Sequence, residues 1–186
     1  MTKQDVFEIS LGLFDRTYTD EDYAAAEPPK EIRYCQRYYD MAIAKTLRER
    51  NWSFLIKELD IDTGYSEPGY GFAYGYYLPF NLFTVTQVGN NEPYRVVGDM
   101  LFTNELTVRR FHGIYKEVDL DAVPEDFVEL IACVLAYILA PMLAPAGVMD
   151  QPVMQRYTWA FQGLLDAECN NNSRAPDFVA GEDHYG

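Results

Sequence analysis

The sequence is poor in the residues that most often build metal sites and disulfide frameworks. It has two histidines, His112 and His184, and three widely spaced cysteines, Cys35, Cys133 and Cys169. Neither histidine has a cysteine or carboxylate partner at a spacing that metal sites use. An odd number of distant cysteines argues against a disulfide framework and for folding in a reducing compartment. We therefore expect no metal site, and we expect each cysteine to be a packed thiol.

Catalytic signatures are missing as well. The chain has no Gly-x-Ser-x-Gly motif, no phosphate-binding Gly-x-x-x-x-Gly-Lys loop and no dinucleotide fingerprint. Glu58, Asp60 and Asp62 alternate along an extended stretch, which could place two acids as in a glycosidase or form a cation site. Surface acidity explains them more simply, because the glycine turn and the final glutamate of a calcium loop are absent. The sequence predicts no catalytic residue and no cofactor.

Basic residues are scarce. The chain has 15 lysines and arginines against 29 acidic residues, a net charge of −14. A general nucleic-acid binder must neutralise phosphates, so this charge disfavours one, although DNA could pass nearby without binding. The N-terminal residues mix charges with apolar side chains and lack a secretory run, which indicates synthesis in the cytoplasm.

One uncharged segment is long enough to cross a membrane. Residues 130–149 carry no charge, and a spanning helix has about this length. The segment contains Pro141, Pro145 and Gly147, and its flanks are acidic on both sides without the Lys/Arg asymmetry that orients spanning helices. These features favour a helix inside a folded protein over a membrane span.

Apolar periodicity predicts four helices joined by an acidic linker and a β region. The helices are expected at about 2–14, 29–50, 124–143 and 151–169. Thr2 and Asp5 form a capping box at the first start, and prolines at 29 and 124 suit the starts of the second and third helices. The linker is expected over residues 15–27.

The second helix has an apolar side and a basic side. Its buried stripe is expected to contain Ile32, Cys35, Tyr39, Ala42 and Thr46. On the other side Arg33, Arg37 and Arg48 fall within about sixty degrees of one another, since each helical residue turns about 100°. The basic side is either a solvated face paired with nearby carboxylates or a contact to an acidic partner.

Residues 52–118 are expected to form an inserted antiparallel sheet. Trp52, Phe54 and Ile56 alternate with the intervening side chains, which predicts a strand. A turn between two apolar runs, 82–88 and 94–97, predicts a hairpin. Further extended segments are expected at 100–103 and 106–115.

A loop rich in tyrosine and glycine is expected over residues 64–77. Glycines at 64, 69, 71 and 75 alternate with six aromatic residues there. Glycine permits unusual backbone angles, and tyrosine offers a rigid ring with a polar tip. The rings can cover the core, form a protein contact or stack on sugars.

The third predicted helix is apolar on nearly all sides. A helix without a polar face has to be buried all round. Neighbouring subunits could supply the missing cover, or the helix could be the internal, central one of its own bundle. The sequence thus predicts an α+β fold, a bundle of about four helices with an inserted β region, in one domain over residues 1–170. Residues 171–186 are expected to form an extended tail.

The order of these segments resembles the tail tubular protein A family, the head-to-tail adaptor rings of short-tailed bacteriophages. The resemblance covers residues 5–170 and is carried by three short motifs in this order. They are Ala44-Lys45-Thr46-Leu47-Arg48-Glu49-Arg50-Asn51-Trp52-Ser53-Phe54, then Tyr77-Leu78-Pro79-Phe80-Asn81-Leu82, then Val123-Pro124-Glu125-Asp126-Phe127 at the start of the apolar helix.

The resemblance implies a structural virion protein in the neck of the particle. Such a protein forms a closed, dodecameric ring below the portal, extends the DNA channel and carries the next tail component. In this hypothesis Arg33, Arg37 and Arg48 pair with acids of an adjoining subunit or of the portal, and Trp52 and Phe54 anchor the sheet on the bundle. The remaining expected interface residues are Tyr70, Tyr74, Tyr77, Pro79 and Phe178.

Two other functions fit the sequence less directly. A virion-associated peptidoglycan hydrolase requires paired acids in a cleft, and only Glu58, Asp60, Asp62 and the acids near Glu125 are candidates. A helical binding module without a viral role would be a monomer or dimer in dilute solution.

Overall fold

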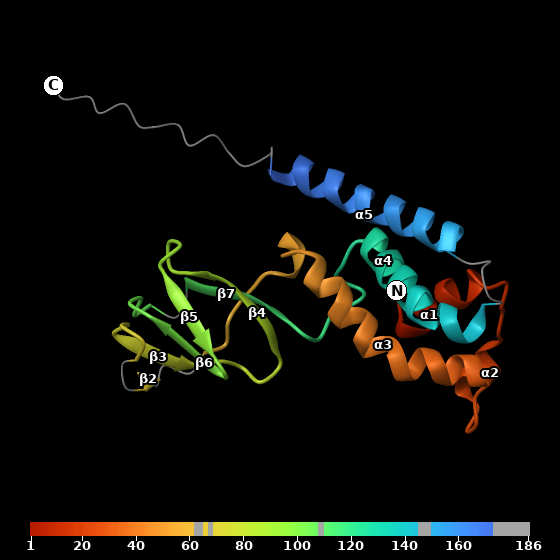
Figure 1. The fold of residues 1–186 in the computed structure, drawn as a ribbon, viewed down its shortest axis with the longest axis horizontal. Helices are drawn as coiled ribbons and strands as arrows, with labels where there is room; N and C mark the ends of the chain where they lie inside the picture. Colours follow the sequence, from red (N-terminus) through yellow and green to blue (C-terminus); the bar gives the residue numbers. More distant parts are fainter. Residues whose placement is uncertain (62–64, 67–68, 108–109, 145–149, 173–186) are drawn as a thin grey trace.

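The computed structural model describes residues 1–61, 65–66, 69–107, 110–144 and 150–172, and it confirms the α+β class (Figure 1). The helices are α1 (Lys3–Gly12), α2 (Asp20–Ala24), α3 (Lys30–Glu49), the 3-10 helix η1 (Ser53–Leu55), α4 (Glu125–Leu143) and α5 (Asp150–Asn172). The strands are β1 (Lys57–Glu58), β2 (Tyr65–Ser66), β3 (Tyr74–Tyr77), β4 (Leu82–Val88), β5 (Tyr94–Val97), β6 (Met100–Thr103) and β7 (Phe111–Tyr115). The β region follows α3 and precedes α4, as predicted.

The helix starts follow local signals. The Asp5 amide donates to the Thr2 hydroxyl at 3.3 Å and the Thr2 amide donates to the Asp5 carboxylate at 2.6 Å, which confirms the capping box of α1. Pro29 and Pro124 occupy the positions just before α3 and α4. The expected linker contains an unpredicted helix, α2, which begins with a second capping box. Because α2 buries none of its residues, it leaves no apolar stripe in the sequence.

The central helix of the bundle is α4. Helices α1, α3 and α5 all pack against it (Figure 1). Its buried residues are Phe127, Val128, Leu130, Ile131, Ala132, Cys133, Val134, Leu135, Ala136 and Leu139. The hydroxyl of Ser10, on α1, donates to the Ala132 carbonyl at 2.9 Å. The chain itself covers most of α4, which is the second of the two arrangements that the sequence left open, a helix central to its own bundle. Tyr137 and Met142 stay exposed.

Among the described helices, α4 alone is long and apolar enough to cross a membrane. Of this stretch, 56% is buried inside the structure. Three other helices pack on it, which is the arrangement of a core helix.

The chain leaves α3 through η1 and not through a strand. The alternation from Trp52 to Ile56 predicted a strand, and that prediction is wrong. Trp52 is fully buried, and its indole N–H donates to the Thr46 carbonyl at 3.0 Å. The Leu55 amide donates to the Trp52 carbonyl at 3.0 Å and closes the 3-10 turn. The contact of the indole with the helices thus overrides the local extended pattern.

A buried carboxylate joins α5 to this junction. Glu168 accepts a hydrogen bond from the Ser53 amide at 2.8 Å and pairs with the Arg50 guanidinium at 2.9 Å. The same guanidinium lies 5.6 Å from the Trp52 ring centroid. One side chain of α5 therefore satisfies the first amide of η1 and neutralises Arg50, the residue that follows α3.

The β region contains two antiparallel sheets, with strand orders β1-β7-β4 and β2-β3-β6-β5. Strands β4 and β5 lie in different sheets, so the predicted hairpin of these two strands is wrong. The Gly89 amide donates to the Arg110 carbonyl at 3.0 Å, which keeps the end of β4 bound to the β7 side. The turn after β5 does form a hairpin, in which Val97 faces Met100.

Two further strand predictions need correction. The expected loop over residues 64–77 contains strands β2 and β3, and β3 pairs with β6. Tyr76 is buried there, which agrees with rings that cover the core. Of the extended segment expected over 106–115, the structure has strand β7 at Phe111–Tyr115, whereas Leu106 and Thr107 are not in a strand.

The buried residues form two clusters. The larger one lies in the bundle and includes Trp52 and Leu55 from the junction and Ile114 from β7. The smaller one lies between the sheets and contains Leu59, Ile61, Tyr76, Val85, Val88, Leu101 and Phe111. Strand β7 contributes to both clusters, so it connects the β region to the bundle.

Candidate protein-binding surface

The basic side of α3 is exposed and lacks ion pairs. The opposite side of this helix buries Ile32, Ala42 and Leu47 in the bundle, which turns Arg33, Arg37 and Arg48 outward. The ion pairs of the described residues join the N-terminal ammonium to Asp121, Arg50 to Glu168, and Arg156 to Glu129. None of them involves the three predicted arginines.

The charge of α3 differs in sign from that of the whole chain. The helix carries five basic and three acidic residues, whereas the chain has a net charge of −14. The Arg37 guanidinium lies 6.0 Å from the ring centroid of its neighbour Tyr38. Since these cations are not neutralised within the described part of the molecule, they can form ion pairs with an acidic partner.

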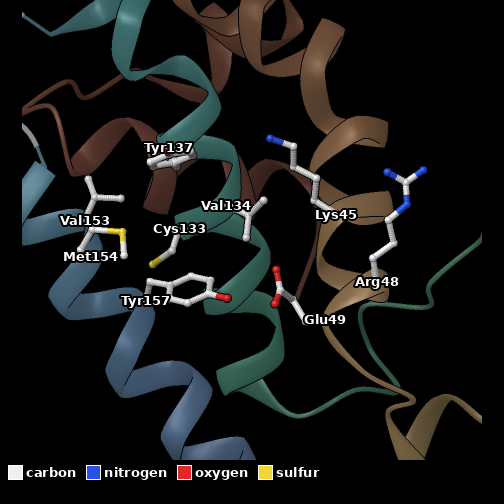
Figure 2. A pocket seen from close by; sticks show the side chains of 9 residues that line it. All are labelled: Lys45, Arg48, Glu49, Cys133, Val134, Tyr137, Val153, Met154 and Tyr157. Atoms are coloured by element: carbon white, nitrogen blue, oxygen red, sulfur yellow. The ribbon is translucent and has the colours of Figure 1, made fainter.

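A groove opens between α3 and α5, above α4 (Figure 2). It encloses about 490 Å³. Cys133, Val134 and Val153 are buried and belong to its apolar wall. Tyr137 is 56% exposed at the opening. An apolar side chain of a partner would therefore find an unfilled, apolar space there.

Charged groups surround this groove. Lys45 reaches toward Tyr137, and its ammonium lies 6.0 Å from that ring centroid (Figure 2). The Glu49 carboxylate faces the hydroxyl of Tyr157, and burial together with this carboxylate raises the pKa of Tyr157. Arg48 also lines the groove. Two cations free of ion pairs thus border an apolar space.

The groove lacks an activated nucleophile. Burial raises the pKa of the Cys133 thiol to about 12, so the thiol stays protonated near neutral pH. Cys35, inside the bundle, has its pKa raised to about 12 for the same reason. The arrangement suits non-covalent binding of an apolar and acidic segment, and neither Cys35 nor Cys133 is an activated thiol.

The predicted residues Tyr70, Tyr74 and Tyr77 lie in the β region, whereas the arginines lie on α3 (Figure 1). Tyr70 and Tyr77 are exposed, and Tyr70 packs edge-on against Phe102 with 4.9 Å between ring centroids. The Arg95 guanidinium lies 4.9 Å from the Tyr70 ring centroid. Tyr74 packs against the buried cluster between the sheets. The residues predicted as one interface therefore belong to two separate surfaces, one on α3 and one in the β region, and Tyr74 packs inward.

Pro79 borders a second groove, between the edges of β4 and β5. This groove encloses about 380 Å³. Phe80, beside Pro79, is 91% exposed, and the Tyr94 hydroxyl donates to the Val85 carbonyl at 3.2 Å across one end. Sequence reasoning missed Phe80, although it stands within the Tyr-Leu-Pro-Phe motif.

Trp52 and Phe54 belong to the bundle core and its edge. Trp52 is fully enclosed by the chain, with ring centroids 5.4 Å from Phe127 and 5.8 Å from Phe161. Phe54 is half-buried and packs on Trp52 and Phe127. Trp52 therefore offers no surface to a partner, and its contacts hold the junction on α4 and α5. Phe178 lies outside the described residues.

The sequence also missed Lys45, Tyr137 and Met154 as members of the groove. Lys45 is three residues before Arg48, so helical spacing could have added it to the basic side. Tyr137 could also have been predicted to reach the surface, since its hydroxyl is a polar group within an apolar run. Met154, on α5, reaches the groove only through the tertiary packing of the helices, and the sequence contains no local pattern that predicts this position.

The other chemical candidates do not assemble into a site. Among the residues that the structure describes, no three metal-ligating side chains come together. Asp62 and His184 lie outside those residues. His112, on β7, is half-buried, and its Nδ1 is enclosed without a hydrogen-bond partner in the described structure.

Comparison with known proteins adds no relative. No protein-family model matches the sequence, and no curated protein matches it either.

Proposed function

We propose that this chain is a structural subunit of a head-to-tail connector ring in a short-tailed bacteriophage. The ring would sit below the portal, extend the DNA channel and carry the next tail component. The order of helices, junction and β region supports this proposal, as does the resemblance of the three motifs. The single observation that carries the partner contact is the row of exposed arginines on α3, which form no ion pair with the described residues of this acidic chain.

The net charge is consistent with a channel protein. A ring of copies that each carry a net charge of −14 would repel the phosphates of passing DNA where its acids face the channel. Repulsion of this kind keeps a channel from holding the genome that it must release.

The first prediction concerns Arg37. An Arg37→Glu variant should bind the portal at least about tenfold more weakly, because the change replaces an attraction to acids with a repulsion. The measurement is the fraction of portals that carry rings, by negative-stain microscopy, after the chain is mixed with the portal encoded in the same genome. Lys57→Glu, an equal charge change on exposed β1, is the matched control.

The circular dichroism spectrum and melting temperature of Arg37→Glu should equal those of the native chain, because the side chain is exposed and buries nothing. Undiminished ring attachment by Arg37→Glu would contradict the role of this surface. If neither the native chain nor the control forms rings with the portal, the proposed function itself is wrong.

A helical binding module without a viral role is the second candidate. It is favoured by the burial of α4 within its own chain, because this burial removes the need for neighbouring copies. This candidate expects a monomer or dimer that ignores the portal. The portal mixture therefore separates the two functions.

A further inference from the structure

The groove above α4 has an apolar wall and free cations but no cover. Helices α3 and α5 both pack on α4 and hardly touch each other, which leaves the space open. Lys45, Arg48 and Glu49 border it, and none of the three takes part in the ion pairs of the described residues. A segment that fits must combine small or apolar side chains with carboxylates.

The chain itself carries a segment of this kind. Residues 15–27 contain five acids and one arginine, and they end in three exposed alanines before Glu27. Helix α2 lies within the segment and has no fully buried residue, although Tyr18 and Tyr23 of the segment pack against the bundle cluster. Glu21 and Glu27 are exposed and belong to none of the ion pairs that the structure describes. An acidic segment with an exposed end and a groove bordered by two cations and one carboxylate therefore occur on the same molecule.

The two surfaces lie at opposite ends of α3. The acidic segment precedes the first turn of α3, whereas Lys45 and Arg48 stand in its last turns (Figure 1). A helix of this length spans about 30 Å, so the segment cannot reach the groove of its own molecule while both stay in place. It can reach the groove of another copy. Such a contact joins two different surfaces and is therefore head-to-tail.

We propose that the acidic segment 15–27 of one copy docks in the α3–α5 groove of the next copy. Its carboxylates pair with Lys45 and Arg48, and its alanines cover the apolar wall. Head-to-tail contacts close into a ring when the rotation between copies allows it. This inference rests on the proposed function, because the contact joins neighbouring subunits of the proposed ring. The contact of Arg37 with the portal is a separate one.

Charge reversal on each surface tests the contact. The groove variant is Lys45→Glu with Arg48→Glu, and the segment variant is Glu21→Lys with Glu27→Lys. Sedimentation velocity from micromolar to millimolar protein at low salt should show association of the native chain. Each variant alone should associate at least about tenfold more weakly, since each places like charges in contact.

An equimolar mixture of the two variants should regain association, because each reversed surface then meets an opposite one. The control variant is Glu58→Lys with Asp60→Lys, which changes the net charge as much as the segment variant but lies in the β region. It should associate at least as well as the native chain. Circular dichroism confirms that every variant is folded.

Three results would overturn the proposal. They are a native chain that stays monomeric throughout this concentration range, a mixture that does not regain association, and a control that loses association as the segment variant does. If any of these occurs while the native chain still forms rings on the portal, only the groove contact fails and the proposed function stands.

Discussion

Trp52 shows how a single side chain fixes the connection between the bundle and the β region. It is one of two tryptophans in the chain, and it touches α4 and α5 through Phe127 and Phe161. Its indole N–H satisfies the carbonyl of Thr46 near the end of α3. Trp52 therefore anchors the junction from inside the subunit, as the sequence hypothesis stated, and it exposes no surface for the interface role that the same hypothesis gave it.

Replacing this ring should destabilise the fold strongly. Trp52→Ala leaves a cavity among aromatic rings and an unpaired Thr46 carbonyl, so we expect a loss of about 3–5 kcal/mol in the free energy of unfolding. The measurement is the urea midpoint, followed by circular dichroism. Trp159→Ala is the matched control, since this tryptophan is 67% exposed, and it should change stability by no more than about 0.5 kcal/mol. Equal losses in both variants would refute the structural role of Trp52.

At the scale of elements, Gly113 holds the β1-β7-β4 sheet together by its lack of a side chain. A Cβ atom at this position would lie 2.5 Å from the Thr84 carbonyl oxygen and 2.7 Å from the Leu59 Cδ2 atom. The closer of these neighbours is backbone, which cannot turn away as a flexible side chain can. Strands β4 and β7 therefore require glycine here.

Gly113→Ala should separate β4 from β7 and lower stability by about 1–3 kcal/mol, as overpacking does. Thermal unfolding followed by circular dichroism measures the loss. Gly12→Ala is the control, because a Cβ atom at Gly12 meets nothing within 4 Å. A melting temperature of Gly113→Ala that matches the control would show that the sheet yields without cost.

Elements with local signals could be predicted from the sequence, and those that depend on distant partners could not. The Thr2–Asp5 capping box and the prolines before α3 and α4 act within one turn of helix, so their helices were placed within two residues. Strand β4 pairs with β7, and no local signal separates that pairing from a hairpin with β5. The same reason explains η1, since Trp52 is drawn into the bundle by helices far along the chain.

The candidate surface divides in the same way. Helical spacing placed Arg33, Arg37 and Arg48 on one side of α3, because that geometry is local. The groove forms only where α3, α4 and α5 come together, so its lining residues could not be predicted from the sequence. The apolar pattern of α4 indicates that the helix is covered, but it does not indicate which chain covers it. In the structure, α1, α3 and α5 of the same chain pack on α4.

At the scale of the whole molecule, the two buried clusters differ in size. Among the described residues, 21 buried ones belong to the bundle cluster and seven to the cluster between the sheets. Buried apolar area is the main favourable term in folding, so the bundle should hold most of the stability. The edge strands β2 and β5 add unpaired backbone groups to the weaker part.

This difference predicts the order in which the molecule opens. Hydrogen exchange followed by mass spectrometry should find the amides of α4 exchanging slowest, through global unfolding, and those of β5 exchanging fastest among the described strands, through local opening. Trp52→Ala should accelerate exchange in α4 far more than in β5, because it weakens the bundle cluster while β5 already opens on its own. If β5 instead exchanges as slowly as α4, and both accelerate equally in Trp52→Ala, the two clusters unfold as one unit. In that case β7, which contributes to both clusters, couples them more tightly than their sizes indicate.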